Sequence, residues 1–202
     1  MTDAPLLSKI ARDIETTGPM RIDHFMATAM TDPDHGYYST GAPIGEGGDF
    51  ITAPEISQMF GELLGLWAVD TWQRLGCPNP FYLVELGPGR GTLMVDALRA
   101  AGAVRPFLEA MELHMVEASR PMRVMQSTKI DRTIQHHDRF SDIPADAPII
   151  LIANEFLDAL PIRQFQKTGK GWCERLIGLD KKPTLPGLPK QDGDHLCFAL
   201  LD

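Results

Sequence analysis

Apolar residues recur every three or four positions along the first third of the chain, which is the spacing of amphipathic helices. This pattern predicts one helix over about residues 5–17 and a shorter one over about 20–30. Thr52 and Glu55 have the spacing of a capping box, so we expect a long helix to begin there and to run to about Leu75. The first part of the chain is therefore expected to be helical.

From residue 81 onward, short apolar runs alternate with helical patterns. Strands are predicted over 81–86, 112–117, 133–136 and 148–153. Helices are predicted over 92–101, about 104–111 and 120–129. This alternation is typical of a parallel, doubly wound sheet. The fourth strand is almost wholly apolar, which predicts a central place in the sheet.

The pattern changes again after residue 160. Two extended runs, 162–166 and 172–177, flank a Lys- and Gly-rich turn and predict a β-hairpin. A loop is expected over 181–194, followed by one more strand over 196–201. We therefore expect an α/β fold with a doubly wound, mostly parallel sheet, an N-terminal helical extension and a hairpin after the fourth strand. Because the chain stops directly after a strand, we expect a fragment of a longer protein.

Composition and charge narrow the classes of function. The formal net charge of −8 argues against a nucleic-acid partner, because phosphate binding needs a basic surface. The three cysteines form no Cys-x-x-Cys pair, and the histidines lack ligand spacing, so no metal site is expected. The sequence has neither a targeting segment nor a run of apolar residues that could span a membrane. A cytoplasmic, bacterial-type protein is the resulting expectation.

The strongest chemical signal is the turn after the first predicted strand, which reads Glu85-Leu86-Gly87-Pro88-Gly89-Arg90-Gly91. A strand that runs through glycines into a helix brings backbone N–H groups close to a ligand. The spacing Gly-x-Gly-x-Gly differs from the Gly-x-Gly-x-x-Gly of dinucleotide folds. Glu85 would repel a pyrophosphate but would suit the cationic amino-acid portion of S-adenosylmethionine. We expect S-adenosylmethionine as cofactor, the alternative being an ordinary tight turn between strand and helix.

Two further acidic residues follow the next strands at the same expected edge of the sheet. Glu117 ends the second strand, where a carboxylate can accept both ribose hydroxyls. This feature serves NAD as well as S-adenosylmethionine. Asp138 follows the third strand, where an Asp often meets the adenine amino group in methyltransferases. The alternatives are a solvated strand-end glutamate and a loop-capping aspartate.

A polar segment, Asn154-Glu155-Phe156-Leu157-Asp158, follows the fourth strand. Polar groups at the end of a central strand can orient an amine or guanidinium nucleophile, and a carboxylate binds guanidinium through paired hydrogen bonds. Glu155 is the candidate orienting carboxylate, with Asp158 second and Asn154 beside them. The alternative is helix capping by Asn154 with Glu155 in the first turn.

Four blocks of sequence, in order, are similar to those of a known family. They are Asp34-His35-Gly36-Tyr37-Tyr38, the run from Gly47 to Glu62 that begins Gly47-Gly48-Asp49-Phe50-Ile51-Thr52-Ala53-Pro54-Glu55, the glycine turn, and Ala153 to Pro161. Together they resemble the complex I assembly factor 7 family of mitochondrial proteins and bacterial relatives. Taken alone, the second block would read as a Gly-rich loop followed by a helix cap.

The resemblance implies a class I methyltransferase fold and, in mitochondrial members, symmetric dimethylation of an arginine on a core subunit of respiratory complex I. It assigns the cofactor positions to Gly87, Gly89, Gly91 and Glu117, and the post-strand motif to Asn154 and Glu155. It also implies a lid over cofactor and substrate arginine that contains Gly48, Asp49, Thr52, Pro54 and Glu55.

The expected organisation is an N-terminal helical region with the lid loop over 1–78 and a C-terminally incomplete methyltransferase core over 79–202. The expected partner is a protein substrate, possibly a complex I subunit in the mitochondrial manner. Two other functions stay open: an assembly module that binds S-adenosylmethionine without turnover, and an NAD-dependent oxidoreductase. The sequence does not indicate the oligomeric state.

Overall fold

The computed structural model describes residues 5–37, 52–180 and 195–201, and the chain divides into two compact units. One unit consists of Met1–Ala42 together with Ala159–Asp202, and the other of Pro43–Asp158. These boundaries differ from the division expected at residue 78. The N-terminal helices share a unit with the hairpin, whereas the long helix that precedes residue 78 belongs with the parallel sheet.

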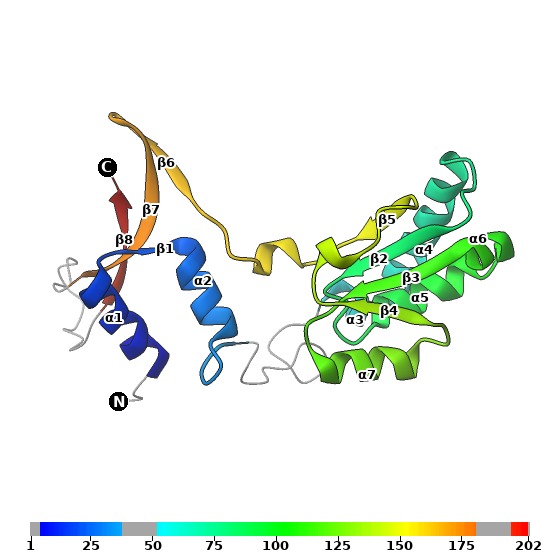
Figure 1. The fold of residues 1–202 in the computed structure, drawn as a ribbon, viewed down its shortest axis with the longest axis horizontal. Coiled ribbons are helices and arrows are strands. Elements are labelled where there is room, and N and C mark those ends of the chain that lie inside the picture. Colours follow the sequence, from blue (N-terminus) through cyan, green and yellow to red (C-terminus); the bar gives the residue numbers. More distant parts are fainter. Residues whose placement is uncertain (1–4, 38–51, 181–194, 202) are drawn as a thin grey trace. The chain divides into compact units, whose positions relative to one another are not determined.

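The unit Pro43–Asp158 is built on a four-stranded parallel sheet with strand order β4-β3-β2-β5 (Figure 1). Its strands are β2 (Phe81–Leu86), β3 (Met111–Val116), β4 (Ile134–His137) and β5 (Ile149–Ile152). All three pairings in this sheet are parallel and in continuous register. The expected α/β fold with a parallel sheet is therefore confirmed.

The helices of this unit are α3 (Ala53–Ile56), α4 (Gln58–Arg74), α5 (Thr92–Ala101), α6 (Arg105–Ala110) and α7 (Arg120–Lys129). Two 3₁₀ turns cover Phe140–Asp142 and Leu157–Ala159. The last three α-helices lie where the sequence predicts them.

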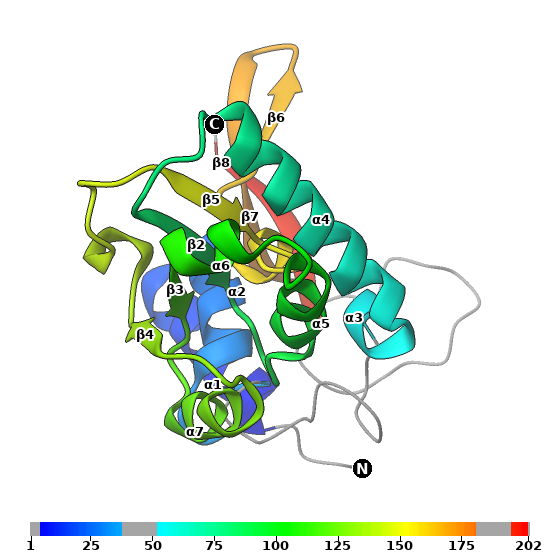
Figure 2. The same ribbon diagram turned by 90° about the vertical axis from the view of Figure 1, so that its right-hand side faces the viewer.

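The prediction of a single long helix from residue 52 is wrong, because two helices, α3 and α4, take its place (Figure 2). Ser57 separates them. Ser57 has extended backbone angles and caps α4 by accepting a hydrogen bond from the Met59 N–H, 3.2 Å away. The Thr52 side chain makes no capping hydrogen bond to α3. The Glu55 carboxylate instead accepts a hydrogen bond from the Thr92 hydroxyl, so the expected capping box is not formed.

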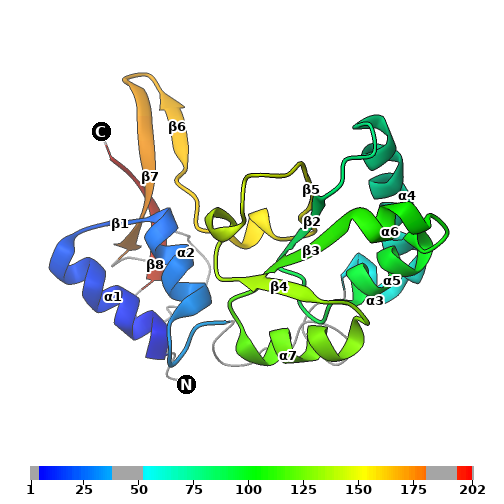
Figure 3. The same ribbon diagram turned by 45° about the vertical axis from the view of Figure 1, so that its right-hand side comes forward.

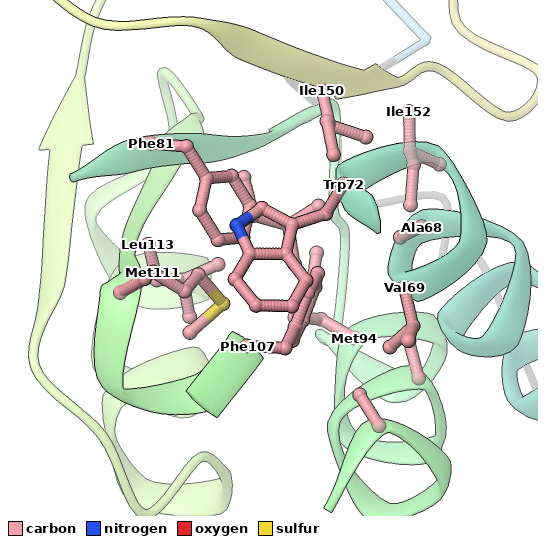
Figure 4. Packing of buried hydrophobic residues seen from close by; sticks show 14 of the residues in the cluster. Ala68, Val69, Trp72, Phe81, Met94, Phe107, Met111, Leu113, Ile150 and Ile152 are labelled. Atoms are coloured by element: carbon pink, nitrogen blue, oxygen red, sulfur yellow. The ribbon is translucent and has the colours of Figure 1, made fainter. Parts of the chain in front are cut away.

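Helices α4 and α5 pack with their backbones close together. A Cβ atom built on Gly65 would lie 2.2 Å from the Ala97 carbonyl oxygen, and one built on Gly61 would lie 2.7 Å from the Asp96 Cβ. Only glycine permits this approach, which brings both helices onto one apolar layer of the sheet. Trp72, Phe81 and Phe107 meet in that layer with ring centroids 5.0–6.1 Å apart (Figure 4). This layer packs β2, which leads into the glycine turn, against the helices.

The predicted central position of β5 is also wrong for the described part of the sheet. β5 pairs only with β2 there and forms an edge, and its Leu151 side chain is 37% exposed. An apolar run indicates that both faces of a strand are covered by other elements. It does not reveal which strands pair with its edges.

The other unit contains a small antiparallel sheet, in which β7 pairs with β1, β6 and β8 (Figure 3). Its elements are α1 (Pro5–Thr17), β1 (Met20–Arg21), α2 (Ile22–Thr31), β6 (Phe165–Thr168), β7 (Gly171–Asp180) and β8 (His195–Leu201). The two predicted helices, the hairpin and the last strand are confirmed. Ile10, Ile14 and Ile22 form its core with Ile177 of β7. The candidate functional residues discussed below lie in the other unit.

Candidate functional site

The three glycines after β2 all have positive φ angles: 63° at Gly87, 51° at Gly89 and 77° at Gly91. A Cβ atom at Gly87 would lie 2.5 Å from the Phe156 ring, and one at Gly91 would lie 3.3 Å from the Gln126 side chain. At Gly89 a Cβ atom would meet nothing within 4 Å. Packing therefore requires Gly87 and Gly91, whereas Gly89 borders open space that a ligand can occupy.

Helix α5 begins directly after this turn and carries no acidic residue in its first turn. Its N-terminal N–H groups and helix dipole therefore favour a negatively charged ligand group such as a carboxylate. The Thr92 hydroxyl, at the start of α5, donates to Glu55 Oε1 over 2.8 Å. One residue of the expected lid is thus held beside the glycine turn.

The ends of β2, β3 and β4 are joined by backbone hydrogen bonds at the same edge of the sheet. The Gly87 N–H donates to the Val116 carbonyl over 3.0 Å, and the Glu117 N–H donates to the His137 carbonyl over 3.1 Å. Glu117 lies one residue beyond β3, not within it as expected. Its carboxylate is half-buried and accepts a hydrogen bond from the Ser119 N–H at 2.8 Å, which leaves acceptor capacity for ribose hydroxyls.

Arg123 of α7 organises the loop ends around Glu117 and Asp138. Its guanidinium donates to the Glu117 carbonyl at 2.6 Å and to the His137 carbonyl at 3.1 Å. It also pairs with the Asp138 carboxylate, which is largely exposed. The Asp138 carboxylate keeps a second oxygen that can accept a further donor.

Gln126, also on α7, is fully buried and reaches the glycine turn. Its Nε2 donates to the Gly89 carbonyl at 2.7 Å. Neither Arg123 nor Gln126 was expected from the sequence. The available signal was a glutamine at a position spaced by four from both Met122 and Ile130, where an apolar residue is usual.

Glu85 points into the apolar layer between β2 and the helices, because it alternates with Tyr82 and Val84 and shares a face with Phe81 and Leu83. Its side chain is 3% exposed, and within the described residues its Oε2 atom has no hydrogen-bond partner. Burial raises the pKa of Glu85 to about 8, so the group is mostly neutral at pH 7. The prediction that Glu85 suits the cationic amino-acid portion of S-adenosylmethionine assumed a negative charge, and this charge is largely absent at pH 7.

The segment after β5 lies against the glycine turn through the contact of Phe156 with Gly87. Glu155 has a φ of 46°, a left-handed conformation that is unfavourable for a residue with a side chain. Glu155 and Asp158 are exposed and Asn154 is half-buried. In the described residues that directly follow β5 there is only a 3₁₀ turn, Leu157–Ala159, so the alternative of Asn154 as an α-helix cap does not apply.

The expected lid residues fall into two groups. Gly48 and Asp49 lie outside the described residues. Thr52, Pro54 and Glu55 are half-buried at α3, and the Thr52 carbonyl accepts a hydrogen bond from the Glu55 N–H at 2.9 Å. Among the lid residues that the structure describes, Glu55 is connected to the start of α5 by the hydrogen bond from Thr92 to its carboxylate.

The part of the chain that the structure describes shows neither a cluster of metal ligands nor a helix that could span a membrane. There, no three side chains of His, Cys, Asp or Glu gather closely enough to hold a metal ion. In the same residues, none of the helices combines the length and apolar character needed to cross a membrane.

Curated proteins of similar sequence match nearly the whole chain. The bovine mitochondrial protein arginine methyltransferase NDUFAF7 is 37% identical over 98% of this chain and 48% of its own length. The human protein of the same name is 37% identical over 97% of this chain and 48% of its own length. The chain therefore spans about half the length of the curated relatives that it matches.

Two solved structures from Burkholderia thailandensis share this fold. One is a COG1565 superfamily member and likely methyl transferase bound to S-adenosyl-homocysteine, with a TM-score of 0.74 and 26% identity over 97% of this chain and 49% of that chain. The other, a native structure of an uncharacterized COG1565 superfamily protein, has a TM-score of 0.70 and 25% identity over 97% of this chain and 47% of that chain.

A family model described as a putative S-adenosyl-L-methionine-dependent methyltransferase matches residues 63–202. This match covers more than half of the chain and includes the glycine turn, the carboxylates after β3 and β4, and the segment after β5. The chain belongs to this family of putative S-adenosyl-L-methionine-dependent methyltransferases.

Proposed function

We propose that this chain carries the S-adenosylmethionine-binding core of a protein arginine N-methyltransferase. The observation that carries the proposal is the open space over Gly89, at the start of α5 and beside the Glu117 carboxylate. The relatives named as protein arginine methyltransferases and the S-adenosyl-homocysteine in a structure of the same fold support it.

The residues at the sheet edge fit the cofactor part by part. The N–H groups that follow Gly89 at the start of α5 suit its carboxylate, Glu117 suits the ribose hydroxyls and Asp138 suits the adenine amino group. Gly87 and Gly91 shape the turn. When bound, S-adenosylmethionine supplies a methyl group on a positively charged sulfur, ready for transfer to a nucleophilic nitrogen.

The segment after β5 is proposed to position the substrate guanidinium. Glu155 and Asp158 are exposed carboxylates, and a carboxylate binds guanidinium through two parallel charge-assisted hydrogen bonds. Such binding holds one nitrogen in a fixed direction, which is how positioning lowers the barrier of a displacement reaction. The left-handed backbone conformation at Glu155 costs energy, and such strain is common at functional sites. Asn154 is proposed to assist as a neutral hydrogen-bonding group.

The proposed substrate is an arginine on a protein, which suits a chain with a net charge of −8. A more specific proposal, a subunit of respiratory complex I or a related protein, follows from the resemblance of the four sequence blocks. Because the relatives are about twice as long, turnover is best measured on a protein of their full length that contains these residues.

Calorimetric titration of the chain with S-adenosylhomocysteine and, separately, with NAD tests the cofactor. We expect binding of the first and none of the second; the opposite result would overturn the proposal. Labelled-methyl transfer to arginine then tests the enzyme, because an assembly module would bind the cofactor without transferring its methyl group.

The role of Glu155 is tested by Glu155→Gln, which keeps the shape of the side chain and removes its charge. Turnover should fall by about ten- to a hundredfold while S-adenosylhomocysteine binding stays nearly unchanged. Glu109→Gln, at an exposed glutamate of α6, is the matched control and should change neither. Unchanged turnover in Glu155→Gln would exclude this residue as the orienting carboxylate.

A further inference from the structure

Gln126 is a buried polar side chain that contacts three separate parts of the candidate site. Its Nε2 lies 2.7 Å from the Gly89 carbonyl oxygen in the glycine turn and 3.4 Å from Glu117 Oε2. Its Oε1 lies 2.8 Å from Nε2 of His136 on β4. The side chain is 0% exposed, so solvent cannot take the place of these partners.

The chemistry of its neighbours fixes the orientation of the Gln126 amide. A carbonyl and a carboxylate oxygen can only accept here, so the NH₂ group must face them and donate both of its hydrogens. The amide oxygen must then accept from His136, which requires a proton on His136 Nε2. Burial, together with Arg123 and His137, lowers the pKa of His136 below its usual value, so the ring is mostly neutral at pH 7 and carries its single proton at Nε2.

The contact with Gly89 also sets the direction of a peptide group. In a planar trans peptide, the C=O and the following N–H point in opposite directions. Holding the Gly89 carbonyl against α7 therefore aims the N–H of the next residue, Arg90, away from α7. A flipped peptide would present its carbonyl oxygen in place of a donor and would repel an anionic ligand group.

We propose that Gln126 is a positioning residue for cofactor binding, which keeps the Glu117 carboxylate and the Gly89 peptide in their binding orientations. This inference rests on the proposed function. Gln126 would act on the cofactor through the Glu117 carboxylate and the Gly89 peptide, which it holds in place. Hydrogen bonds to charged or buried partners are strong enough for the loss of this arrangement to weaken binding measurably.

The test compares S-adenosylhomocysteine with its 2′,3′-dideoxy analogue, which lacks the ribose hydroxyls. Gln126→Met keeps the length of the side chain and removes its hydrogen bonds. We expect the affinity for S-adenosylhomocysteine to fall about tenfold and the affinity for the analogue to fall less, because the Gly89 peptide serves both ligands whereas Glu117 serves only the ligand with ribose hydroxyls. The variant should therefore discriminate less well between the two ligands than the wild type does. A purely structural role would weaken both ligands by the same factor.

Gln135→Met is the matched control, because Gln135 also donates to a glutamate, Glu112, but does so at the surface. It should leave both affinities unchanged. A second variant, His136→Leu, keeps Gln126 but removes the donor that fixes its amide. It should also reduce the preference for S-adenosylhomocysteine over the analogue, by a smaller factor than Gln126→Met. This second variant decides the question if Gln126→Met does not fold.

The outcomes separate this inference from the proposed function. If the wild-type chain binds S-adenosylhomocysteine but folded variants lose no affinity, or lose it equally for both ligands, the positioning role is overturned and the proposed function stands. If the wild-type chain does not bind S-adenosylhomocysteine, both are overturned.

Discussion

Replacement of Glu85 by glutamine should stabilise the protein, and the gain should grow with pH. Glu85 is buried in an apolar layer, and burial raises its pKa from the usual 4.5 to about 8. Between these two values the unfolded chain has released a proton that the folded protein retains. The free energy of unfolding therefore decreases as pH rises through this window and levels off above about pH 8.

The size of the effect follows from the displacement of the pKa. Each pH unit above 4.5 costs about 1.4 kcal/mol until the folded group also ionises. The cost is below about 1 kcal/mol at pH 5 and roughly 3 kcal/mol at pH 7. A glutamine has nearly the same shape and no proton to release, so Glu85→Gln should regain about these amounts in the free energy of unfolding.

Urea denaturation at half-unit steps from pH 5 to pH 8 measures the difference between the two proteins. Fluorescence of the buried Trp72 follows the unfolding of the unit that contains Glu85. Both proteins carry the substitution Trp172→Phe, which removes the tryptophan signal of the other unit. Glu109→Gln, at the surface of α6, serves as the control and should be indifferent to pH. A stability difference between Glu85→Gln and wild type that stays constant with pH, or a variant that is less stable at pH 7, would refute the reasoning.

Three further substitutions probe packing, the glycine turn and a buried histidine. Gly65→Ala should lower the free energy of unfolding by about 1–3 kcal/mol, since its methyl group would meet the Ala97 carbonyl; Gly169→Ala, where nothing lies within 4 Å, is the control in the same urea titration. Gly89→Ala should cost only about 1 kcal/mol for its positive φ, yet it should weaken S-adenosylhomocysteine binding measured by calorimetry, because its methyl group enters the open space. Burial and the adjacent His137 lower the pKa of His114, so below pH 6.5 the unfolded chain takes up a proton that the folded protein resists. The stability of the wild type relative to His114→Phe should therefore fall from pH 7 to pH 5, whereas the contribution of Glu85 is common to both proteins and cancels in this difference. A difference between the two proteins that stays constant with pH would contradict this.

Residues close together in sequence account for most of what could be predicted. The strand Phe81–Leu86 and the helix after it follow from an apolar run, three glycines and a helical period within about twenty residues. The hairpin of β6 and β7 follows in the same way from a turn between two extended runs. The division into compact units differs from the predicted break at residue 78, because it depends on which elements pack together.

The predicted central place of β5 and the capping box at Thr52 failed for related reasons. The neighbours of a strand in a sheet are chosen by the whole chain, and Glu55 binds Thr92, which lies 37 residues away, in preference to its own helix end. Likewise, no pattern of charge reveals that Glu85 faces an apolar layer and is largely neutral at pH 7.

The sequence alone was enough to identify the family and the parallel α/β fold, and it predicts the edge of the sheet at which a ligand would bind. These depend on periodicity and on short motifs, in which the interacting atoms belong to neighbouring residues. The folded structure was needed to find Gln126, whose amide joins the Gly89 carbonyl, 37 residues away, to Glu117 and His136. Such a contact exists only after α7 packs against the sheet, because packing brings together groups that the chain keeps far apart.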